Sequence, residues 1–157
     1  MQGIGVSFRG TYRFLSNFYN FETPMRKVIY SNTQPHILHF KSVESFYMAM
    51  KTTNPLLRVK ISSASGAEAK RLGKLLDIRE DWDDIKEDVM LYALRYKFST
   101  LNPQLRQKLI NTGDSYLQEG NWWNDKYWGV CLKTCEGLNR LGCLLMDVRG
   151  EINELAN

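Results

Sequence analysis

A carboxylate and an amine lie seven residues apart near the middle of the first half of the chain. Glu44 and Lys51 fall on one face of a helix expected from Ser42 through Lys51, with Tyr47 and Met48 between them. A carboxyl group and an amine that converge on one place can carry acid–base or covalent chemistry. The same spacing also fits an unspecialised helix, in which Glu44 favours the helix N-terminus and Lys51 is a solvated charge.

Two irregular segments are rich in aromatic and polar side chains. Residues 10–18 read GTYRFLSNF and residues 121–129 read NWWNDKYWG, while a further tryptophan, Trp82, follows Asp81. Loops on a rigid scaffold commonly carry binding groups. Indole faces stack on flat heterocycles and basic neighbours bind phosphate, although a tryptophan is as often part of the core.

The cysteines indicate neither a disulfide framework nor a metal site. Cys131, Cys135 and Cys143 are three in number and clustered, which favours reduced thiols in the cytoplasm. Their spacing is not that of a zinc knuckle, although His36 and His39 could complete a set of four ligands. The sequence contains no P-loop or dinucleotide fingerprint either. We therefore expect no metal and no other cofactor.

Composition narrows the class of protein. The chain has 157 residues, 43% of them hydrophobic, which predicts one domain over residues 1–157. No apolar run approaches the roughly 18 residues of a membrane helix, and the first residues lack the pattern of a signal peptide. The net charge is +4, with 12 Lys and Arg against 5 Asp and Glu in residues 1–80, and 9 against 12 in residues 81–157. A basic half indicates an anionic ligand, either nucleic acid or a small phosphate ester.

The spacing of apolar residues predicts the strands and helices that position these segments. Short strands are expected at residues 6–8, 27–30 and 37–41. Helices are expected over residues 42–51, from Pro55, over 65–76, after Asp83 and Asp84, over 103–112, and over 138–155. The pattern predicts an α+β fold, mainly helical, with a small N-terminal β-sheet.

These segments, in this order, resemble the YbiA-like (NADAR) family from about Phe8 to Arg149. The matching residues are Tyr12-x-Phe14-Leu15-Ser16-Asn17-Phe18, Ser42-x-Glu44-x-x-Tyr47-x-Ala49-x-Lys51, Ala69-Lys70-x-x-Gly73, Arg79-x-Asp81-Trp82, Lys97-Phe98, Asn121-x-Trp123-x-Asp125-x-x-Trp128-Gly129, and Gly137-x-Asn139-x-Leu141-Gly142-x-x-Leu145-Met146-x-x-Arg149. Two positions depart from the family pattern. Ser45 stands where many relatives carry His, and Asn124 where many carry Gly or His.

The resemblance implies a YbiA-like fold and an N-glycosidase. Members of the family hydrolyse ribosylamino-pyrimidine phosphate intermediates of riboflavin synthesis, which releases ribose 5-phosphate. Others act in NAD and ADP-ribose metabolism, including removal of ADP-ribose from guanine. The expected partner is therefore a small phosphorylated N-riboside or ADP-ribosyl ligand, with nucleic acid only as an ADP-ribosylated substrate and no membrane.

The resemblance also assigns roles. Cleavage of the N-glycosidic bond builds positive charge at the anomeric carbon, which Glu44 and Asp125 would stabilise. Lys51 would intercept a ring-opened sugar as a Schiff base. The expected substrate-binding residues are Asn17, Phe18, Arg13, Tyr47, Arg79, Trp82, Trp128, Gly129 and Asn139. Arg13 and Arg79 would take phosphate, although pairing of an arginine with a carboxylate is an equal alternative.

Two readings of other classes stay open at this point. One is a nucleic-acid-binding module that uses basic and exposed aromatic residues. The other is a ligand-binding protein without catalysis, since Ser45 removes a possible proton shuttle. The sequence leaves the oligomeric state and the physiological substrate open.

Overall fold

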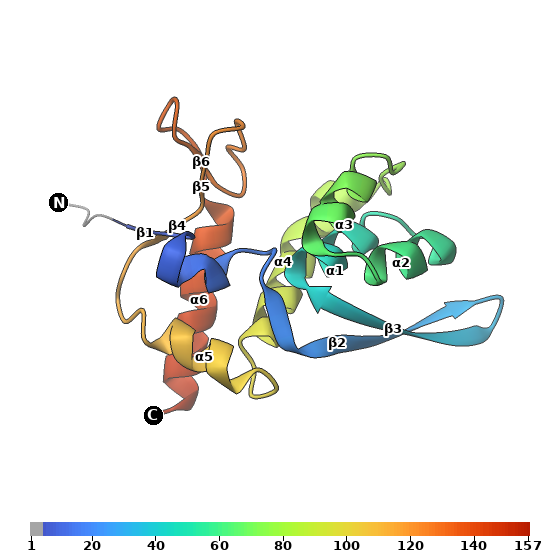
Figure 1. Ribbon diagram of the computed structural model, residues 1–157, viewed down its shortest axis with the longest axis horizontal. Helices are drawn as coiled ribbons and strands as arrows, with labels where there is room; N and C mark the ends of the chain where they lie inside the picture. The colour runs from blue at the N-terminus through green and yellow to red at the C-terminus, as the bar shows by residue number, and fades with distance from the viewer. Residues whose placement is uncertain (1–4) are drawn as a thin grey trace. The chain divides into compact units, whose positions relative to one another are not determined.

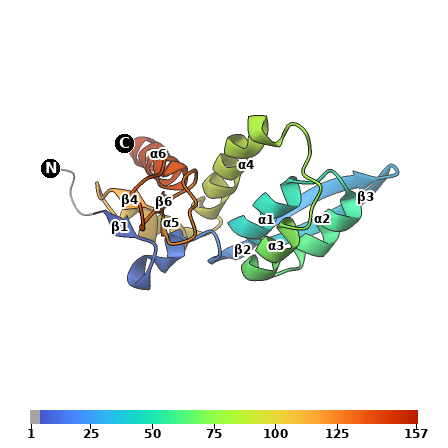
Figure 2. The same cartoon turned by 90° about the horizontal axis from the view of Figure 1, so that it is seen from above.

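The computed structural model describes residues 5–157, which divide into two compact units. One unit joins residues 5–16 to Pro103–Asn157, and the other is Asn17–Asn102. The units are drawn in Figure 1 and Figure 2 and are described separately. The expectation of one domain over residues 1–157 stays a prediction. Among the residues described, no helix is both long and apolar enough to cross a bilayer.

The unit Asn17–Asn102 is built on a β-hairpin. Strand β2 (Asn20–Ser31) pairs antiparallel with β3 (Gln34–Ser42), with Lys27 opposite Leu38 and a bulge between Asn20 and Met25. The two-residue turn places Asn32 and Thr33 at φ 48° and 65°, the left-handed region that tight hairpin turns use. The expected strands at residues 27–30 and 37–41 are confirmed as the middle of this ribbon.

Four helices complete this unit. They are α1 (Val43–Met50), α2 (Pro55–Ser62), α3 (Gly66–Gly73) and α4 (Trp82–Lys97). Helices α1 and α2 pack against β3, and α3 and α4 pack against α1 (Figure 2). Helix α1 is therefore enclosed by the hairpin and the other helices, and every residue from Val43 to Ala49 is buried.

The starts of α1 and α2 follow from their capping residues. Ser42 and Ser45 form a reciprocal capping box on α1, with Ser45 N donating to Ser42 Oγ at 3.2 Å and Ser42 N to Ser45 Oγ at 3.3 Å. Asn54 Oδ1 accepts from Leu56 N at 2.9 Å ahead of Pro55. Ser45, which replaces the histidine of many relatives, thus has a structural role in this chain.

The second unit contains short parallel strand pairings, a 3-10 helix and two α-helices. Strand β1 (Val6–Ser7) pairs with β4 (Leu117–Gln118), and β5 (Gly120–Asn121) with β6 (Val130–Cys131). A 3-10 helix, η1, spans Gly10–Leu15, and the α-helices are α5 (Pro103–Ile110) and α6 (Arg140–Leu155). Buried Arg149 of α6 donates to Thr112 Oγ1 at 2.8 Å, which ties α6 to the end of α5.

The α+β, mainly helical prediction is confirmed, and the differences lie at helix ends. Helix α3 ends at Gly73, before the expected Leu76. Helix α4 begins at Trp82, so Asp83 and Asp84 lie inside its first turn, where carboxylates favour the helix dipole. Inclusion of Leu138 in the last helix is wrong. Asn139 has φ 51°, and Leu138, 62% exposed, lies outside α6.

A lysine lies fully buried in the last turn of α4. Lys97 is 0% exposed, and its Nζ lies 5.4 Å from the ring centroid of Phe98 and 6.0 Å from that of Tyr19. Burial disfavours the charged ammonium and lowers the pKa of Lys97 from 10.5 to about 7. The difference in the pKa of Lys97 between the folded and unfolded chain makes the free energy of unfolding depend on pH.

We expect the free energy of unfolding to rise as the pH increases from 7 to 9. Over that range the unfolded chain retains on Lys97 a proton that the folded chain releases, because the pKa is about 7 when folded and 10.5 when unfolded. The slope from this group is on the order of 1 kcal/mol per pH unit. Urea denaturation at several pH values should show a flatter profile for Lys97→Met than for wild type. Lys74→Met, on an exposed position, should retain the wild-type slope, and a wild-type slope in Lys97→Met would refute the assignment.

Candidate active site

Glu44 is a buried carboxylate at the start of α1. It lies in the first turn, 7% exposed, and its backbone N–H donates to Asn17 O at 3.0 Å. The helix dipole favours an acidic residue there, but it does not require the residue to be buried. A carboxylate withdrawn from water needs a nearby cation or hydrogen-bond donors. Burial therefore distinguishes Glu44 from a solvated carboxylate in the first turn of a helix.

Lys51 supplies a cation at the other end of the same helix. It is the C-cap of α1, and burial lowers the pKa of Lys51 from its usual 10.5. The charge of Glu44 acts in the opposite direction and raises this pKa. The charges of Lys70 and Lys86 lower it further. A larger fraction of the Lys51 amine is thus neutral near physiological pH than for a solvated lysine, which is what a nucleophilic amine requires.

Two aromatic rings lie beside the Lys51 ammonium. Its Nζ is 5.4 Å from the Tyr47 ring centroid and 6.0 Å from that of Trp82. The two rings are 4.9 Å apart and inclined at 59°, and each residue is 6% exposed. Because each ring is largely covered, this pair is a wall beside Lys51 rather than an open stacking surface. Asn17, Glu44, Tyr47, Lys51 and Trp82 are called the α1 cluster below.

Asn17 brings an unsatisfied acceptor to the α1 cluster. Its Nδ2 donates weakly to Met90 Sδ at 3.7 Å, while Oδ1 is buried and lacks a hydrogen-bond partner within residues 5–157. A buried acceptor left unpaired costs about 1–3 kcal/mol. Phe18, the next residue, is 42% exposed, and Lys70 Nζ lies 5.7 Å from its ring centroid. A ligand with an N–H or O–H group would satisfy Oδ1.

Arg79 is engaged by a carboxylate. Its Nε and Nη2 donate to Asp81 Oδ1 and Oδ2 at 2.5 and 3.0 Å, a bidentate pair. Its backbone N–H donates to Lys51 O at 2.9 Å, which connects the α3–α4 linker to the end of α1. The sequence left phosphate binding and carboxylate pairing open for Arg79, and the structure shows carboxylate pairing.

The other candidate carboxylate, Asp125, lies in the second unit and organises its own loop. Asp125 Oδ1 accepts from Tyr127 N at 3.1 Å and Trp128 N at 3.0 Å. The side chain of Asn121 donates to Asp125 O at 2.8 Å and accepts from Asp125 N at 3.0 Å. Asn124 has φ 67°, a conformation open to Gly and Asn, which explains how Asn replaces the Gly of many relatives.

The remaining candidates of the second unit are placed by local packing. The Trp128 ring meets Tyr127 edge to face at 4.9 Å. A Cβ on Gly129 would collide with Glu119 O, so this position requires glycine. Arg13 is exposed on η1.

Asn139 is expected to bind substrate, but its side chain already makes hydrogen bonds within the protein. Its Oδ1 accepts from Glu119 N at 3.0 Å, and its Nδ2 donates to Leu117 O at 2.8 Å and Tyr116 Oη at 3.1 Å. This 2% exposed amide connects β4 to the start of α6, and its side-chain oxygen and nitrogen are both engaged within the protein.

Sequence reasoning did not select two cations near the α1 cluster. Lys70 was part of a family motif without a role, and Lys86 was not singled out. Lys86 follows Trp82 by four residues, so helical spacing placed both on one face of α4. Within residues 5–157 the structure contains no group of three His, Cys, Asp or Glu side chains able to hold a metal ion.

Comparisons with known proteins show the family to which the chain belongs. The sequence profile of the NADAR domain matches residues 7–153. An N-glycosidase of Nostoc punctiforme is 36% identical over 140 residues, covering 80% of this chain and 86% of that protein. A chloroplastic riboflavin biosynthesis protein of Zea mays is 35% identical over 147 residues, or 78% of this chain, which corresponds to 23% of that longer protein.

A solved structure gives the same result. The NMR structure of the Escherichia coli protein YbiA superposes with a TM-score of 0.76 at 31% identity, covering 100% of this chain and 90% of that one. The fold is thus that of the YbiA-like proteins, a class with relatives that are N-glycosidases. The chain belongs to the NADAR family.

The electrostatics of the α1 cluster can be tested by titrating Lys51. We expect NMR of isotopically labelled lysine to give a pKa for Lys51 below 10.5. Glu44→Gln should lower this pKa further, because it removes the charge that favours the ammonium, and Lys86→Met should raise it. Lys41→Met, at an exposed position of β3, serves as the control that leaves it unchanged. If the pKa of Lys51 were not lowered and did not change in Glu44→Gln, the two groups would not interact.

Proposed function

We propose that this protein hydrolyses the N-glycosidic bond between a phosphorylated ribose and a heterocyclic base or amine. We favour ribosylamino-pyrimidine phosphates of riboflavin synthesis as substrates, with release of ribose 5-phosphate. The observation that carries the proposal is the burial of Glu44 beside an amine of lowered pKa, Lys51, in a chain of the NADAR family. The name of the maize relative supports the riboflavin branch.

Glu44 acts on the charge that develops at the anomeric carbon. As the C–N bond lengthens, the sugar takes on oxocarbenium character, and a carboxylate held in a dry position stabilises that charge. Its place in the first turn of α1 is fixed by the capping box and by the bond from Glu44 N to Asn17 O. The group therefore needs little reorganisation during the reaction.

Lys51 offers a covalent route to the same products. An amine-linked ribose opens to an imine at C1, and the neutral Lys51 amine attacks this carbon. The base nitrogen then leaves as a free amine while a Lys51–C1 imine forms. Water hydrolyses this imine to the aldehyde, which closes to ribose 5-phosphate and regenerates Lys51. The Tyr47–Trp82 wall limits access of water to the amine.

Two further residues, each considered within its own unit, are Asn17 and Asp125. Asn17 Oδ1 accepts a hydrogen bond from a substrate N–H or O–H group, which satisfies the unpaired acceptor. Asp125 is the second carboxylate by its family position, and its loop contacts hold the carboxylate in a defined orientation. The three cysteines are free thiols, which supports a cytoplasmic setting for the reaction.

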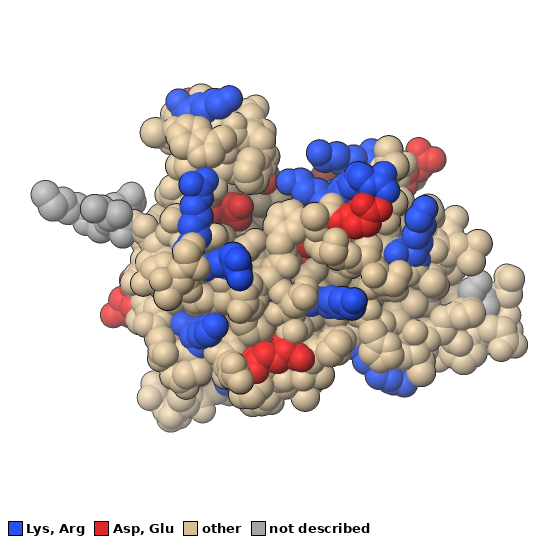
Figure 3. Space-filling view, viewed as in Figure 1, with Lys and Arg blue, Asp and Glu red and all other residues tan. Residues whose placement is uncertain are grey.

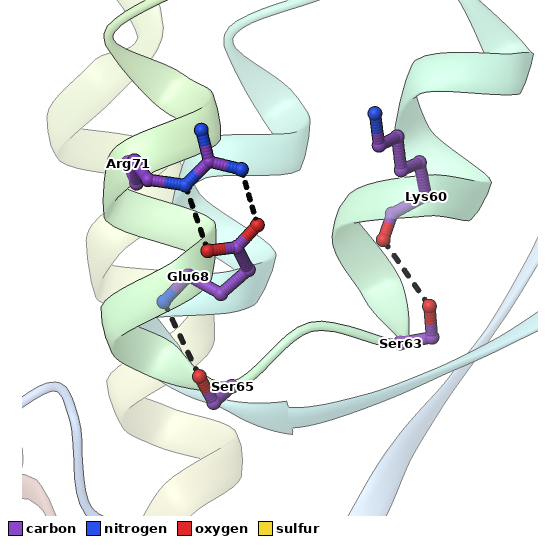
Figure 4. A network of polar contacts seen from close by, with 5 residues as sticks. All are labelled: Lys60, Ser63, Ser65, Glu68 and Arg71. Carbon is purple, nitrogen blue, oxygen red and sulfur yellow. Dashed lines mark hydrogen bonds and ion pairs between the residues drawn. The ribbon is translucent and has the colours of Figure 1, made fainter.

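We expect Glu44→Gln to reduce kcat by about 10²–10³-fold, the scale of a lost charge-stabilising group. Turnover is measured by chromatography of the released base, with a ribosylamino-pyrimidine phosphate and ADP-ribosylated guanosine as separate substrates. Glu68→Gln is the matched control, since Glu68 is a half-exposed α3 carboxylate paired with Arg71 at 2.5 Å (Figure 4). Equal activity of Glu44→Gln and wild type, or no turnover of either substrate by wild type, would overturn the proposal.

The covalent route predicts an adduct that borohydride traps on Lys51. Mass spectrometry after reduction during turnover should place the sugar on Lys51, and Lys51→Met should yield neither adduct nor this route of turnover. Lys74→Met should still give the adduct, because this lysine lies exposed beyond α3. Turnover by wild type without a trapped adduct would instead indicate direct hydrolysis assisted by Glu44.

A further inference from the structure

Positive charge exceeds negative charge around Lys51. Lys70 and Lys86 both lie close enough to repel its ammonium, and Glu44 is the acidic group whose charge acts on it in the opposite direction. All three lysines are partly buried, and the Lys86 side chain is 20% exposed. Like charges held together outside bulk water are unfavourable. A bound anion would remove this repulsion.

The packing of α3 fixes Lys70 toward the α1 cluster. A Cβ on Gly66 would collide with Phe18, and one on Gly73 would collide with Met48 of α1. Lys70 lies between these two glycines along the helix, four residues after Gly66 and three before Gly73, so it shares their face. The contact of its Nζ with the Phe18 ring at 5.7 Å agrees with this direction.

The spacing along α4 fixes Lys86 in the same way. Trp82, four residues earlier, packs on Tyr47, and Met90, four residues later, contacts Asn17. Lys86 therefore lies on the α4 face that is directed at the α1 cluster. Its ion pair with Asp83 at 3.2 Å involves a carboxylate that is 89% exposed, and such a pair contributes little stability. An incoming anion can replace it at small cost.

Two other nearby cations, Arg79 and Arg71, are each held by a carboxylate in a bidentate pair. Arg79 holds Asp81 in a bidentate pair. Arg71 of α3 holds Glu68 in another, so Glu68 is directed at its own helix partner (Figure 4). Figure 3 shows that Lys and Arg side chains gather over the α2–α3 side of this unit, with acidic groups among them. Lys70 and Lys86 thus lie toward the reacting groups, whereas Arg71 and Arg79 are engaged in ion pairs.

We propose that Lys70 and Lys86 form the subsite that binds the phosphate group of the substrate. The inference rests on the proposed function, because it takes Glu44 and Lys51 as the groups that act at the sugar. Two lysine ammoniums bind a phosphate as point charges. With the acceptor of Asn17 nearby for a sugar or base donor, the ligand is a small phosphorylated N-riboside. A phosphate monoester and the diphosphate of ADP-ribose share this chemistry.

Binding to the unreacted protein tests the subsite without turnover. Isothermal titration calorimetry with ribose 5-phosphate, ADP-ribose, inorganic phosphate and unphosphorylated ribose is carried out on wild type, Lys70→Met, Lys86→Met and the double variant. We expect each single substitution to weaken ribose 5-phosphate binding about 10-fold or more, the scale of one charged hydrogen bond, and to leave ribose unchanged. Lys60→Met and Lys74→Met, at exposed lysines of α2 and the end of α3, are the matched controls.

Comparison of the ligands and variants distinguishes the possible kinds of site. Tighter binding of ribose 5-phosphate than of ADP-ribose, lost in the double variant, supports a monoester subsite, and the reverse order supports a diphosphate subsite. Undiminished binding of ribose 5-phosphate, ADP-ribose and inorganic phosphate in the double variant overturns the proposal. Lysine-dependent phosphate binding by a protein that turns over no N-riboside would support the subsite and refute the proposed function.

Discussion

The structure of the Asn17–Asn102 unit depends on a short helix that carries charge into a core. Helix α1 has eight residues, seven of them buried, and a helix of this length is marginal on its own. Its conformation is maintained by the Ser42–Ser45 capping box and by packing against β3, α2, α3 and α4. Burial of α1 withdraws Glu44 from water. It also makes the charge of Lys51, at the far end of the same helix, the natural counterpart of that carboxylate.

The features that suit this unit to a ligand are unfavourable without one. Lys70 and Lys86 repel Lys51, and Asn17 Oδ1 is buried without a partner within the described chain. Each feature lowers the stability of the folded protein. A ligand that brings an anion and a hydrogen-bond donor would relieve both at once, and its binding would stabilise the native state by mass action.

Local rules predicted much of the scaffold and part of the site. Capping residues located the starts of α1 and α2, and the seven-residue spacing placed Glu44 and Lys51 together on one helix. The family resemblance, rather than spacing, favoured a catalytic role for Glu44 over an unspecialised helix. Charge repulsion between Lys70, Lys86 and Lys51 was invisible because it depends on how α3 and α4 pack against α1. Asn139 was assigned to substrate binding through the family resemblance, and its left-handed backbone and its contacts with β4 depend on packing that the sequence does not show.

The close approach of α3 to α1 also makes this part of the protein sensitive to oxidation. Gly73 faces Met48 Sδ so closely that even a Cβ would collide with the sulfur. A methionine sulfoxide adds an oxygen at that atom and turns an apolar group polar. Met48 is 8% exposed, so access to an oxidant would come mainly from brief openings of the helices. An oxygen added during such an opening would oppose reclosure of α3 and move Lys70 away from Lys51, so that peroxide damage at one thioether would change the charge around the amine.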